Sequence, residues 1–351
     1  MTAQTIPSPT EIRQAIAEHP ALRERDLADK LGISEAALIA AQVGDGATRI
    51  AAEPDTLIPM AQTFGEVMAL TRNPACVNEK IGIYANYHSG PHASMVLNDA
   101  IDLRIFPAHW RHAFAVEKQT DSGIRRSLQV FDAAGDAVHK IYLRDASDLG
   151  AWALALKILA LPDQSQTVDV LPRQPDEAPK SDLSKVDVLR KEWTRMTDTH
   201  QFMRLTSKLR MNRLGAYRIA GAPFVRPLVP QAVDQMLEDL RQTGTEVMIF
   251  TGNRGCIQIH SGPIKTLRPM GPWQNVMDPD FNLHLRRDHI AEVWAVEKPT
   301  QRGPAVSVEA FNATGGLIFQ TFGLNKKGEA NRAAWTGLVE GLAGLPEEVS
   351  A

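Results

Sequence analysis

The sequence has few cysteines and no long apolar run, and its charges nearly balance. Two cysteines in 351 residues exclude a disulfide scaffold and any cysteine-rich zinc or iron–sulfur site. The 38 Lys and Arg residues against 41 Asp and Glu residues give a net charge of −3, which does not indicate a nucleic-acid-binding protein. No apolar run approaches the ~20 residues that cross a bilayer, and the N-terminal residues lack a signal-peptide pattern. We therefore expect a cytoplasmic protein that is not embedded in a membrane.

Several short motifs are also missing. The chain has no GxGxxG, no GxxxxGK[ST], no HExxH and no CxxCH. These absences argue against dinucleotide binding, nucleotide phosphate binding, zincin-type hydrolysis and covalent heme attachment.

Segments of the first half recur 180 residues later. Glu66-Val67-Met68 recurs as Glu246-Val247-Met248, and Ala115-Val116-Glu117-Lys118 recurs as Ala295-Val296-Glu297-Lys298. The same offset relates Thr71, Asn73, Cys76, Ser127, Phe131 and Gly135 to Thr251, Asn253, Cys256, Ser307, Phe311 and Gly315. A constant offset over so long a stretch indicates an internal duplication, in which both halves of the chain adopt the same fold.

The repeat predicts two domains joined by a linker. Residues 163–182 are rich in Pro, Asp, Ser and Gln and are typical of an extended connection. We expect domains at 1–162 and 183–351. Each half begins with helical spacing and continues with short β-type runs separated by turn residues, which predicts N-terminal helices, a large antiparallel β-sheet and a closing helix. The expected fold class is α+β with internal duplication.

His200 stands out among the ten histidines because of its position. It follows Asp198, which we interpret as the N-cap of a helix, so its imidazole lies near the positive end of the helix dipole. That position favours the neutral imidazole that a metal or heme iron requires. A histidine that merely bonds to the neighbouring linker is the alternative.

Arg104 lies in the alternating run Ile101-Asp102-Leu103-Arg104-Ile105-Phe106. Alternation places Arg104 and Phe106 side by side on the face opposite the three aliphatic residues. A cation beside an aromatic ring on a sheet face suits a ligand platform, although a solvent-facing arginine is the simpler reading. Its counterpart at the repeat offset is His284, so this position differs between the halves.

Residues 25–38 resemble a helix-turn-helix. The recognition helix, from Ser34 to Val43, carries Glu35 and no Lys or Arg. Contacts to bases and phosphates normally need such basic side chains, so DNA binding is disfavoured.

Three long segments resemble the HemS/ChuS/HmuS proteins, bacterial cytoplasmic heme-trafficking and hemin-degrading factors. They are residues 252–300, beginning GNRGCIQIHSGP, MTDTHQF at 196–202 and DAIDLRIFP at 99–107. The resemblance covers about residues 10–345 and implies a structural duplication with large antiparallel sheets. It also implies non-covalent heme b as ligand and possible substrate.

The resemblance assigns roles to individual residues. His200 matches the proximal ligand of the heme iron, and Arg104 matches the arginine on the distal side, where it would be catalytic if the protein is an enzyme. Pocket positions are matched by Phe106, Met248, Phe250 and Gln320, and basic residues near the heme propionates are matched by Arg213 and Lys298.

The chain departs from the family at a few positions. Relatives read QLYGQR where this chain has Gln320 to Asn325, so Phe322 and Asn325 replace a tyrosine and an arginine. Lys326 or Lys327 could supply the positive charge of the missing arginine. Asn78 replaces a histidine that is common in the first half, which disfavours a second heme site.

The resemblance predicts a protein of heme uptake and iron acquisition that degrades heme or delivers it to a degrading enzyme. A non-catalytic heme chaperone or storage protein is the alternative, and a heme-responsive DNA-binding regulator is a weaker one. Expected partners are heme, an inner-membrane heme importer or a heme oxygenase, and an electron donor if the protein is enzymatic.

Overall fold

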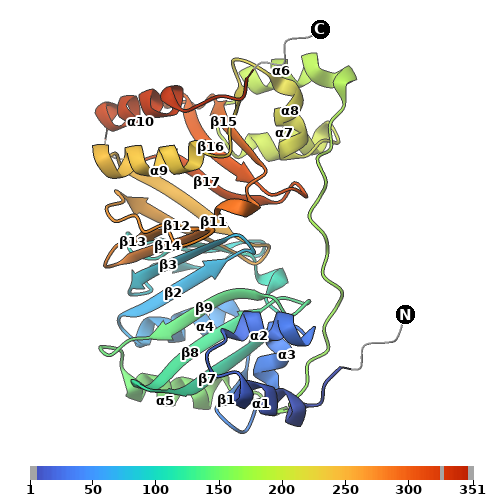
Figure 1. Ribbon diagram of the computed structural model, residues 1–351, viewed down its shortest axis with the longest axis vertical. Helices are drawn as coiled ribbons and strands as arrows, with labels where there is room; N and C mark the ends of the chain where they lie inside the picture. Colours follow the sequence, from blue (N-terminus) through green and yellow to red (C-terminus); the bar gives the residue numbers. More distant parts are fainter. Residues whose placement is uncertain (1–5, 325–327, 347–351) are drawn as a thin grey trace. The chain divides into compact units, whose positions relative to one another are not determined.

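The computed structural model describes residues 6–324 and 328–346 and divides the chain into two compact units (Figure 1). Unit 1 comprises Met1–Arg72, Glu79–Gln174 and Gly252–Gln258, and unit 2 comprises Asn73–Asn78, Pro175–Thr251 and Ile259–Ala351. Each unit therefore contains a short segment from the other half of the sequence. The repeat offset of 180 residues relates the first segment, 73–78, to residues 253–258 of the second.

Unit 1 is built on five consecutive antiparallel strands. In spatial order they are β1 (Ala47–Ile50), β7 (His112–Thr120), β8 (Gly123–Phe131), β9 (Ala137–Leu143) and β2 (Val67–Arg72). A smaller antiparallel group contains β4 (Tyr87–His88), β5 (Ser94–Val96) and β6 (Asp102–Ile105). The helices are α1 (Pro9–Glu18), α2 (Glu24–Leu31), α3 (Glu35–Ala40), α4 (Pro54–Thr63) and α5 (Leu149–Leu159).

Unit 2 repeats this plan. Its five antiparallel strands, in spatial order, are β10 (Val225–Leu228), β15 (Glu292–Lys298), β16 (Ala305–Phe311), β17 (Leu317–Gly323) and β11 (Val247–Gly252). Strands β13 (Trp273–Met277) and β14 (Phe281–Arg286) form a further antiparallel pair. The helices are α6 (Val186–Thr194), α7 (Gln201–Lys208), α8 (Arg213–Ala220), α9 (Ala232–Thr243) and α10 (Glu329–Gly341).

Strands β3 (Cys76–Gly82) and β12 (Cys256–Gly262) each cross the division between the units. Short 3-10 turns occupy Pro107–His109, Leu183–Lys185 and Arg287–His289. Within the described residues, no helix has the length and apolar character that a membrane span requires.

The expected α+β duplication is confirmed, as are the β-type runs and the closing helices α5 and α10. The turn after β16 shows why the strand pairs are antiparallel hairpins. Gly315 adopts φ +93°, which favours glycine, and the Asn312 side chain accepts hydrogen bonds from the backbone N–H groups of Thr314 and Gly316. Asp182 caps the turn before α6, because its side chain accepts a hydrogen bond from the backbone N–H of Ser184.

The two faces of the unit 2 strands are covered by different helices (Figure 1). Residues Val247, Ile249, Val308 and Ala310 share one face and belong to a core that includes buried residues of α9 and α10. Residues Trp294, Val296 and Phe311 share the other face and pack against buried residues of α6, α7 and α8. This second core holds the start of α7 close to the sheet.

Helices α2 and α3 of unit 1 occupy the place of the expected helix-turn-helix. All residues of α3 except Ala37 are buried, including Glu35. A recognition helix must expose one face to a DNA groove, and α3 has no such face.

A buried histidine network in unit 1 has no equivalent in unit 2. The Nδ1 atom of His139 lies 2.8 Å from Thr71 Oγ1, and its Nε2 atom lies 2.5 Å from the Tyr84 hydroxyl. The thiol of Cys256 lies 3.5 Å from the same Thr71 Oγ1. At the repeat offset His139 and Tyr84 correspond to Phe319 and Ile264, so unit 2 is apolar here. Burial lowers the pKa of His139 to about 3 and raises that of Cys256 to about 12, so both groups are neutral in the folded protein.

We predict an acid-dependent loss of stability that originates at His139. The unfolded chain takes up a proton near pH 6.5, whereas the folded protein does so only near pH 3. The contribution is therefore fully present above pH 6.5 and is lost as the pH falls toward 3, by at most ~1.4 kcal/mol per pH unit. Urea unfolding at a series of pH values measures this slope.

The matched control is the double variant His139→Phe/Tyr84→Ile, which installs the residues found at the equivalent positions of unit 2. Its free energy of unfolding should change less between pH 6.5 and 4 than that of the wild type. Equal slopes in the two proteins would assign the acid sensitivity to other groups.

Candidate functional site

One face of the unit 2 strands carries several of the predicted site residues in two adjacent rows. Strand pairing places Trp294, Glu309, Gln320 and Phe250 across β15, β16, β17 and β11, and it places Val296, Ser307, Phe322 and Met248 in the next row. The β11 and β17 members, Met248, Phe250, Gln320 and Phe322, are half-buried. The rings of Phe250 and Phe322 meet edge to face at 5.5 Å between centroids. The end of the face formed by β11 and β17 is therefore largely apolar and partly exposed to solvent.

The other end of the same face carries a buried ion cluster. Glu309 is fully buried, and its carboxylate accepts hydrogen bonds from Lys298 Nζ at 2.9 Å, Arg213 Nη1 at 2.8 Å and Ser307 Oγ at 2.9 Å. The Tyr217 hydroxyl donates to the same carboxylate at 3.0 Å and accepts from Lys298 Nζ at 2.9 Å. Burial alone raises the pKa of Glu309, but the charges of Lys298 and Arg213 outweigh it and hold the pKa below its ordinary value.

Two of the predicted basic residues thus share one carboxylate but differ in exposure. The Lys298 side chain is 4% exposed, whereas that of Arg213 is 22% exposed. The second guanidinium nitrogen of Arg213, Nη2, lies 3.6 Å from the thioether sulfur of Met203 on α7. Of the two cations, Arg213 is the one that reaches the surface.

Helix α7 is anchored on this face by aromatic packing. Phe202 lies 4.5 Å from Trp193 and 5.5 Å from Tyr217 between ring centroids, and Lys298 Nζ lies 5.0 Å from the Phe202 ring centroid. Each such ring pair contributes about 0.5–1.5 kcal/mol beyond its area burial. Phe202, near the start of α7, is therefore held beside Lys298 of the ion cluster.

His200 is the N-cap residue of α7, and its side chain is 95% exposed. Its Nδ1 lies 2.7 Å from Asp198 Oδ1, and its backbone N–H donates to the same oxygen at 2.8 Å. These hydrogen bonds lower the pKa of Asp198. A carboxylate at Nδ1 holds the proton there and leaves the Nε2 lone pair as an acceptor or metal ligand.

The expected role of Asp198 as the helix N-cap is wrong. The helix begins at Gln201, and Asp198 instead orients the imidazole of the true N-cap residue, His200. Gln201 reaches back, because its Oε1 accepts a hydrogen bond from the backbone N–H of Thr197 at 2.9 Å. Of the two neutral tautomers, the Nδ1–H form is therefore the one that the Asp198 carboxylate favours.

Arg104 and Phe106 belong to unit 1. Leu103 and Ile105 on β6 are fully buried while Arg104 and Phe106 are partly exposed, so the predicted alternation is confirmed. The Arg104 guanidinium is paired with Asp102 and donates to the Leu103 carbonyl at 3.0 Å. The Phe106 backbone N–H donates to the Gly255 carbonyl at 2.9 Å.

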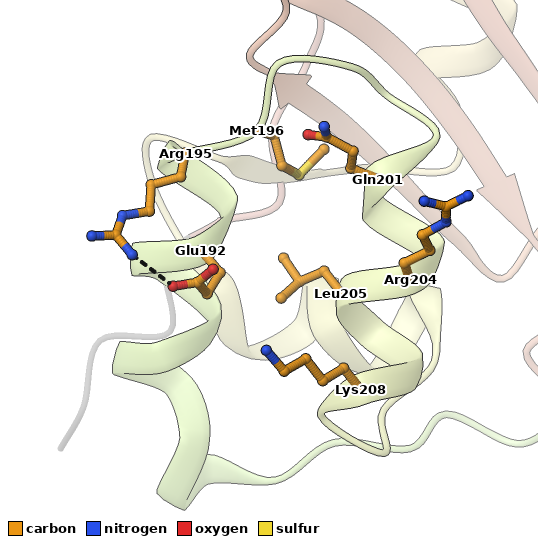
Figure 2. Close-up of a pocket in the computed structure, with 7 residues that line it drawn as sticks. All are labelled: Glu192, Arg195, Met196, Gln201, Arg204, Leu205 and Lys208. Carbon is orange, nitrogen blue, oxygen red and sulfur yellow. Dashed lines mark hydrogen bonds and ion pairs between the residues drawn. The ribbon is translucent and has the colours of Figure 1, made fainter.

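A surface pocket lies between α6 and α7 (Figure 2). Its volume is about 240 Å³, and it is lined by Glu192, Arg195, Met196, Gln201, Arg204, Leu205 and Lys208. Ligand clefts for cofactors usually measure roughly 300–1,000 Å³, and none of the predicted site residues lines this pocket. We therefore place the candidate site on the sheet face rather than in this pocket.

Sequence reasoning missed Asp198 as a partner of His200, as well as Glu309 and Tyr217. The spacing of Asp198 and His200, two residues apart before a helix, could have indicated a carboxylate–imidazole pair. Glu309 offered a further signal, because it is the one charged residue of β16, in which every other residue except Ser307 is apolar. Within the described residues, no group of three or more His, Cys, Asp and Glu side chains is arranged to hold a metal ion.

Comparison with known proteins identifies the family. The family described as "Haemin-degrading HemS.ChuX domain" matches residues 32–159 and 210–342, once in each half of the chain. The chain belongs to the HemS/ChuX family. The hemin transport protein HmuS of Yersinia pestis is 38% identical over 325 residues, covering 92% of this chain and 93% of HmuS.

Two solved HemS/ChuX structures show the same fold. Holo-PhuS of Pseudomonas aeruginosa, described as a heme-binding protein, is 38% identical with a TM-score of 0.91, covering 97% of this chain and 100% of that one. ChuS of E. coli, described as a heme oxygenase, is 33% identical with a TM-score of 0.83, covering 94% and 99%.

The departures from the HemS/ChuX pattern fall in different places. Phe322 is part of the apolar rows and packs on Phe250. Asn325, Lys326 and Lys327 lie outside the described residues. Asn78 is buried in the segment that belongs to unit 2.

We predict that Asp198 sets the tautomer of His200 in the unliganded protein. The Asp198→Asn substitution removes the negative charge that holds the proton at Nδ1, so the imidazole should shift toward the Nε2–H form that free histidine favours. Long-range ¹H–¹⁵N spectra of the histidine rings measure this shift. If the His200 nitrogen shifts are the same in both proteins, Asp198 does not orient the ring.

Proposed function

We propose that this protein binds heme in the cytoplasm as part of heme uptake and iron acquisition. The observation that carries the proposal is the exposed imidazole of His200, whose Nδ1 is held by Asp198. It belongs to a chain with close relatives described as a hemin transport protein and a heme-binding protein.

The residues of unit 2 fit the chemistry of a porphyrin. The Nε2 atom of His200 would be an axial ligand of the iron, which needs a single neutral imidazole rather than a cluster of ligands. Met248, Phe250 and Phe322 offer apolar contacts, and Gln320 lies between them on β17. Arg213 would pair with a heme propionate. Lys298 is buried against Glu309, so we assign it to supporting Arg213 rather than to contacting propionates.

The same site serves both a carrier and an enzyme. Bound heme itself supplies the iron and the conjugated ring on which oxidative cleavage takes place. A carrier would release heme unchanged to a heme oxygenase, whereas an enzyme would open the ring with dioxygen as the oxidant and electrons from a separate donor. An inner-membrane heme importer is the expected source of heme in both cases. Among the relatives, HmuS is described as a transport protein and ChuS as a heme oxygenase, so the family includes both descriptions.

Arg104 is the residue that we propose for the catalytic step if the protein is an enzyme. A guanidinium keeps its charge at any working pH and has five N–H donors, so it can stabilise negative charge but cannot shuttle protons as an imidazole does. In the unliganded chain its charge is satisfied by Asp102.

The His200→Ala substitution tests ligation. The variant should lose the six-coordinate ferric absorption spectrum and bind heme more weakly, by more than the ~10–100-fold that removal of an outer partner of a metal ligand costs. Absorption titration with ferric heme measures both effects. The exposed His92 serves as control, and His92→Ala should bind as the wild type does. An unchanged spectrum and affinity in His200→Ala would overturn the proposed ligand.

The Arg104→Ala substitution tests catalysis separately from binding. Loss of one well-placed donor costs about 100-fold in rate, so ring cleavage should slow by that factor while heme binding changes little. The assay follows the absorbance of bound heme under air with an electron donor and with catalase to remove peroxide.

The exposed Arg111 of unit 1 provides the control, and Arg111→Ala should cleave at the wild-type rate. Cleavage at full rate in Arg104→Ala would contradict a catalytic role for Arg104. Absence of cleavage in the wild type, with tight heme binding, would identify a carrier.

A further inference from the structure

The buried carboxylate of Glu309 organises the charges of the candidate site. Two cations and one carboxylate meet there, so Arg213, Lys298 and Glu309 together carry one uncompensated positive charge. Arg213 is the member of this cluster that extends to the surface, with 22% of its side chain exposed against 0% for Glu309 and 4% for Lys298. The excess charge is therefore presented to solvent through the Arg213 guanidinium.

The contacts of Arg213 fix its orientation and leave it able to receive a ligand. Nη1 is committed to Glu309 Oε2 at 2.8 Å, which anchors one side of the planar guanidinium. Nη2 lies 3.6 Å from Met203 Sδ, and a thioether is a weak acceptor. A carboxylate could replace that sulfur as the partner of Nη2, because only a weak N–H···S contact would be lost. The Arg213 guanidinium is already oriented, so binding the carboxylate would cost little conformational entropy.

The duplicated half shows the opposite charge at the equivalent place. Helix α8 begins with Arg213 after its cap Asn212, whereas α3 of unit 1 begins with Glu35 after its cap Ser34. Glu35 is buried and pairs with Lys140 at 2.6 Å, and Lys140 corresponds to Gln320 at the repeat offset. At the position of Glu309, unit 1 has the buried neutral residue Gln129. At the first residue of the corresponding helix, unit 1 therefore has an acidic residue and unit 2 has a cation.

We propose that Glu309 is a positioning residue that holds Arg213 in the orientation in which it receives a carboxylate of the ligand, with Lys298 and Tyr217 balancing Glu309. The inference rests on the proposed heme binding and adds that recognition of a carboxylate is confined to unit 2 and acts through Glu309. Lys298 is then a buried counter-charge and not a contact of the ligand.

The test compares ferric heme with its dimethyl ester, in which both carboxylates are blocked. Glu309→Gln alone leaves the Lys298 ammonium buried without its partner, which is strongly destabilising. The test variant is therefore Glu309→Gln/Lys298→Met, which removes both charges together and uses at position 309 the residue that the fold accommodates at Gln129. Thermal unfolding without ligand confirms that each variant is folded.

Dissociation constants are measured by absorption titration for the wild type, Arg213→Ala, the double variant and the triple variant that combines them. Arg213→Ala and the double variant should each bind heme about tenfold more weakly, which corresponds to ~1.4 kcal/mol. If Glu309 acts through Arg213, the triple variant should bind no more weakly than Arg213→Ala. All four proteins should bind the dimethyl ester with affinities within about twofold of one another.

Arg218→Ala is the matched control, because Arg218 lies on the same helix and its guanidinium is paired with Glu292. It should bind both ligands as the wild type does. Wild-type affinity in the double variant, a further tenfold loss in the triple variant, or an equal loss with the ester would each overturn the positioning role. Failure of the wild type to bind heme would instead overturn the proposed function.

Discussion

The negative charge of a carboxylate that is removed from water must be balanced by cations and hydrogen-bond donors. This requirement determines which polar residues lie on the face of the unit 2 strands beneath α6, α7 and α8. Glu309 lies in the middle strand of the five and is fully buried. An isolated ionised carboxylate in such a place would cost several kcal/mol. The residues that compensate it come from three elements, namely Lys298 on β15, Tyr217 and Arg213 on α8 and Ser307 on β16. The same contacts fix α8 on the sheet, and α8 in turn supports α7 and the imidazole that precedes it.

The two halves use one scaffold for different charge arrangements. Both place three helices over the same face of five antiparallel strands, and both bury an ion cluster beneath those helices. In unit 1 the helix supplies the acid and the strands supply Lys140 and Arg72, whereas in unit 2 the strand supplies the acid and the helix supplies Arg213. Duplication preserved the backbone because strand register and core packing tolerate few changes. The polar residues beneath the helices could diverge as long as each cluster remained balanced.

Much of this architecture could be predicted from the sequence. The constant offset of 180 residues, the alternation around Arg104 and the turn residues between the β-type runs were sufficient for the duplicated antiparallel fold. The alternation and the turn signals are local, because each concerns residues that are neighbours along the chain, and the repeat shows that the same local signals occur in both halves. The resemblance to known heme proteins, rather than periodicity, supplied the candidate residues.

The parts that could not be predicted depend on contacts between distant residues. Glu309 meets Arg213 across 96 positions, and no local pattern links them. The resemblance implied that Lys298 lies near the heme propionates, and no local pattern indicated that Glu309 would pair with it in the core. The exchange of residues 73–78 and 252–258 between the units was also invisible, since the exchanged segments carry the same sequence signals as their surroundings.

That exchange has a consequence for the order in which the protein can form during synthesis. Unit 1 needs Gly255, whose carbonyl accepts hydrogen bonds from the Phe106 backbone and the Trp110 indole, and it needs Asn253, whose side chain donates to the Arg72 and Val138 carbonyls. At a translation rate of about 5–20 residues per second, the 84 residues from 175 to 258 take roughly 4–17 s to emerge after the rest of unit 1 is complete. During that interval these backbone and indole groups lack their partners from the later sequence and bond to water instead. Two units that look independent in the repeat are therefore obliged to mature together, and neither half of the gene encodes a complete unit.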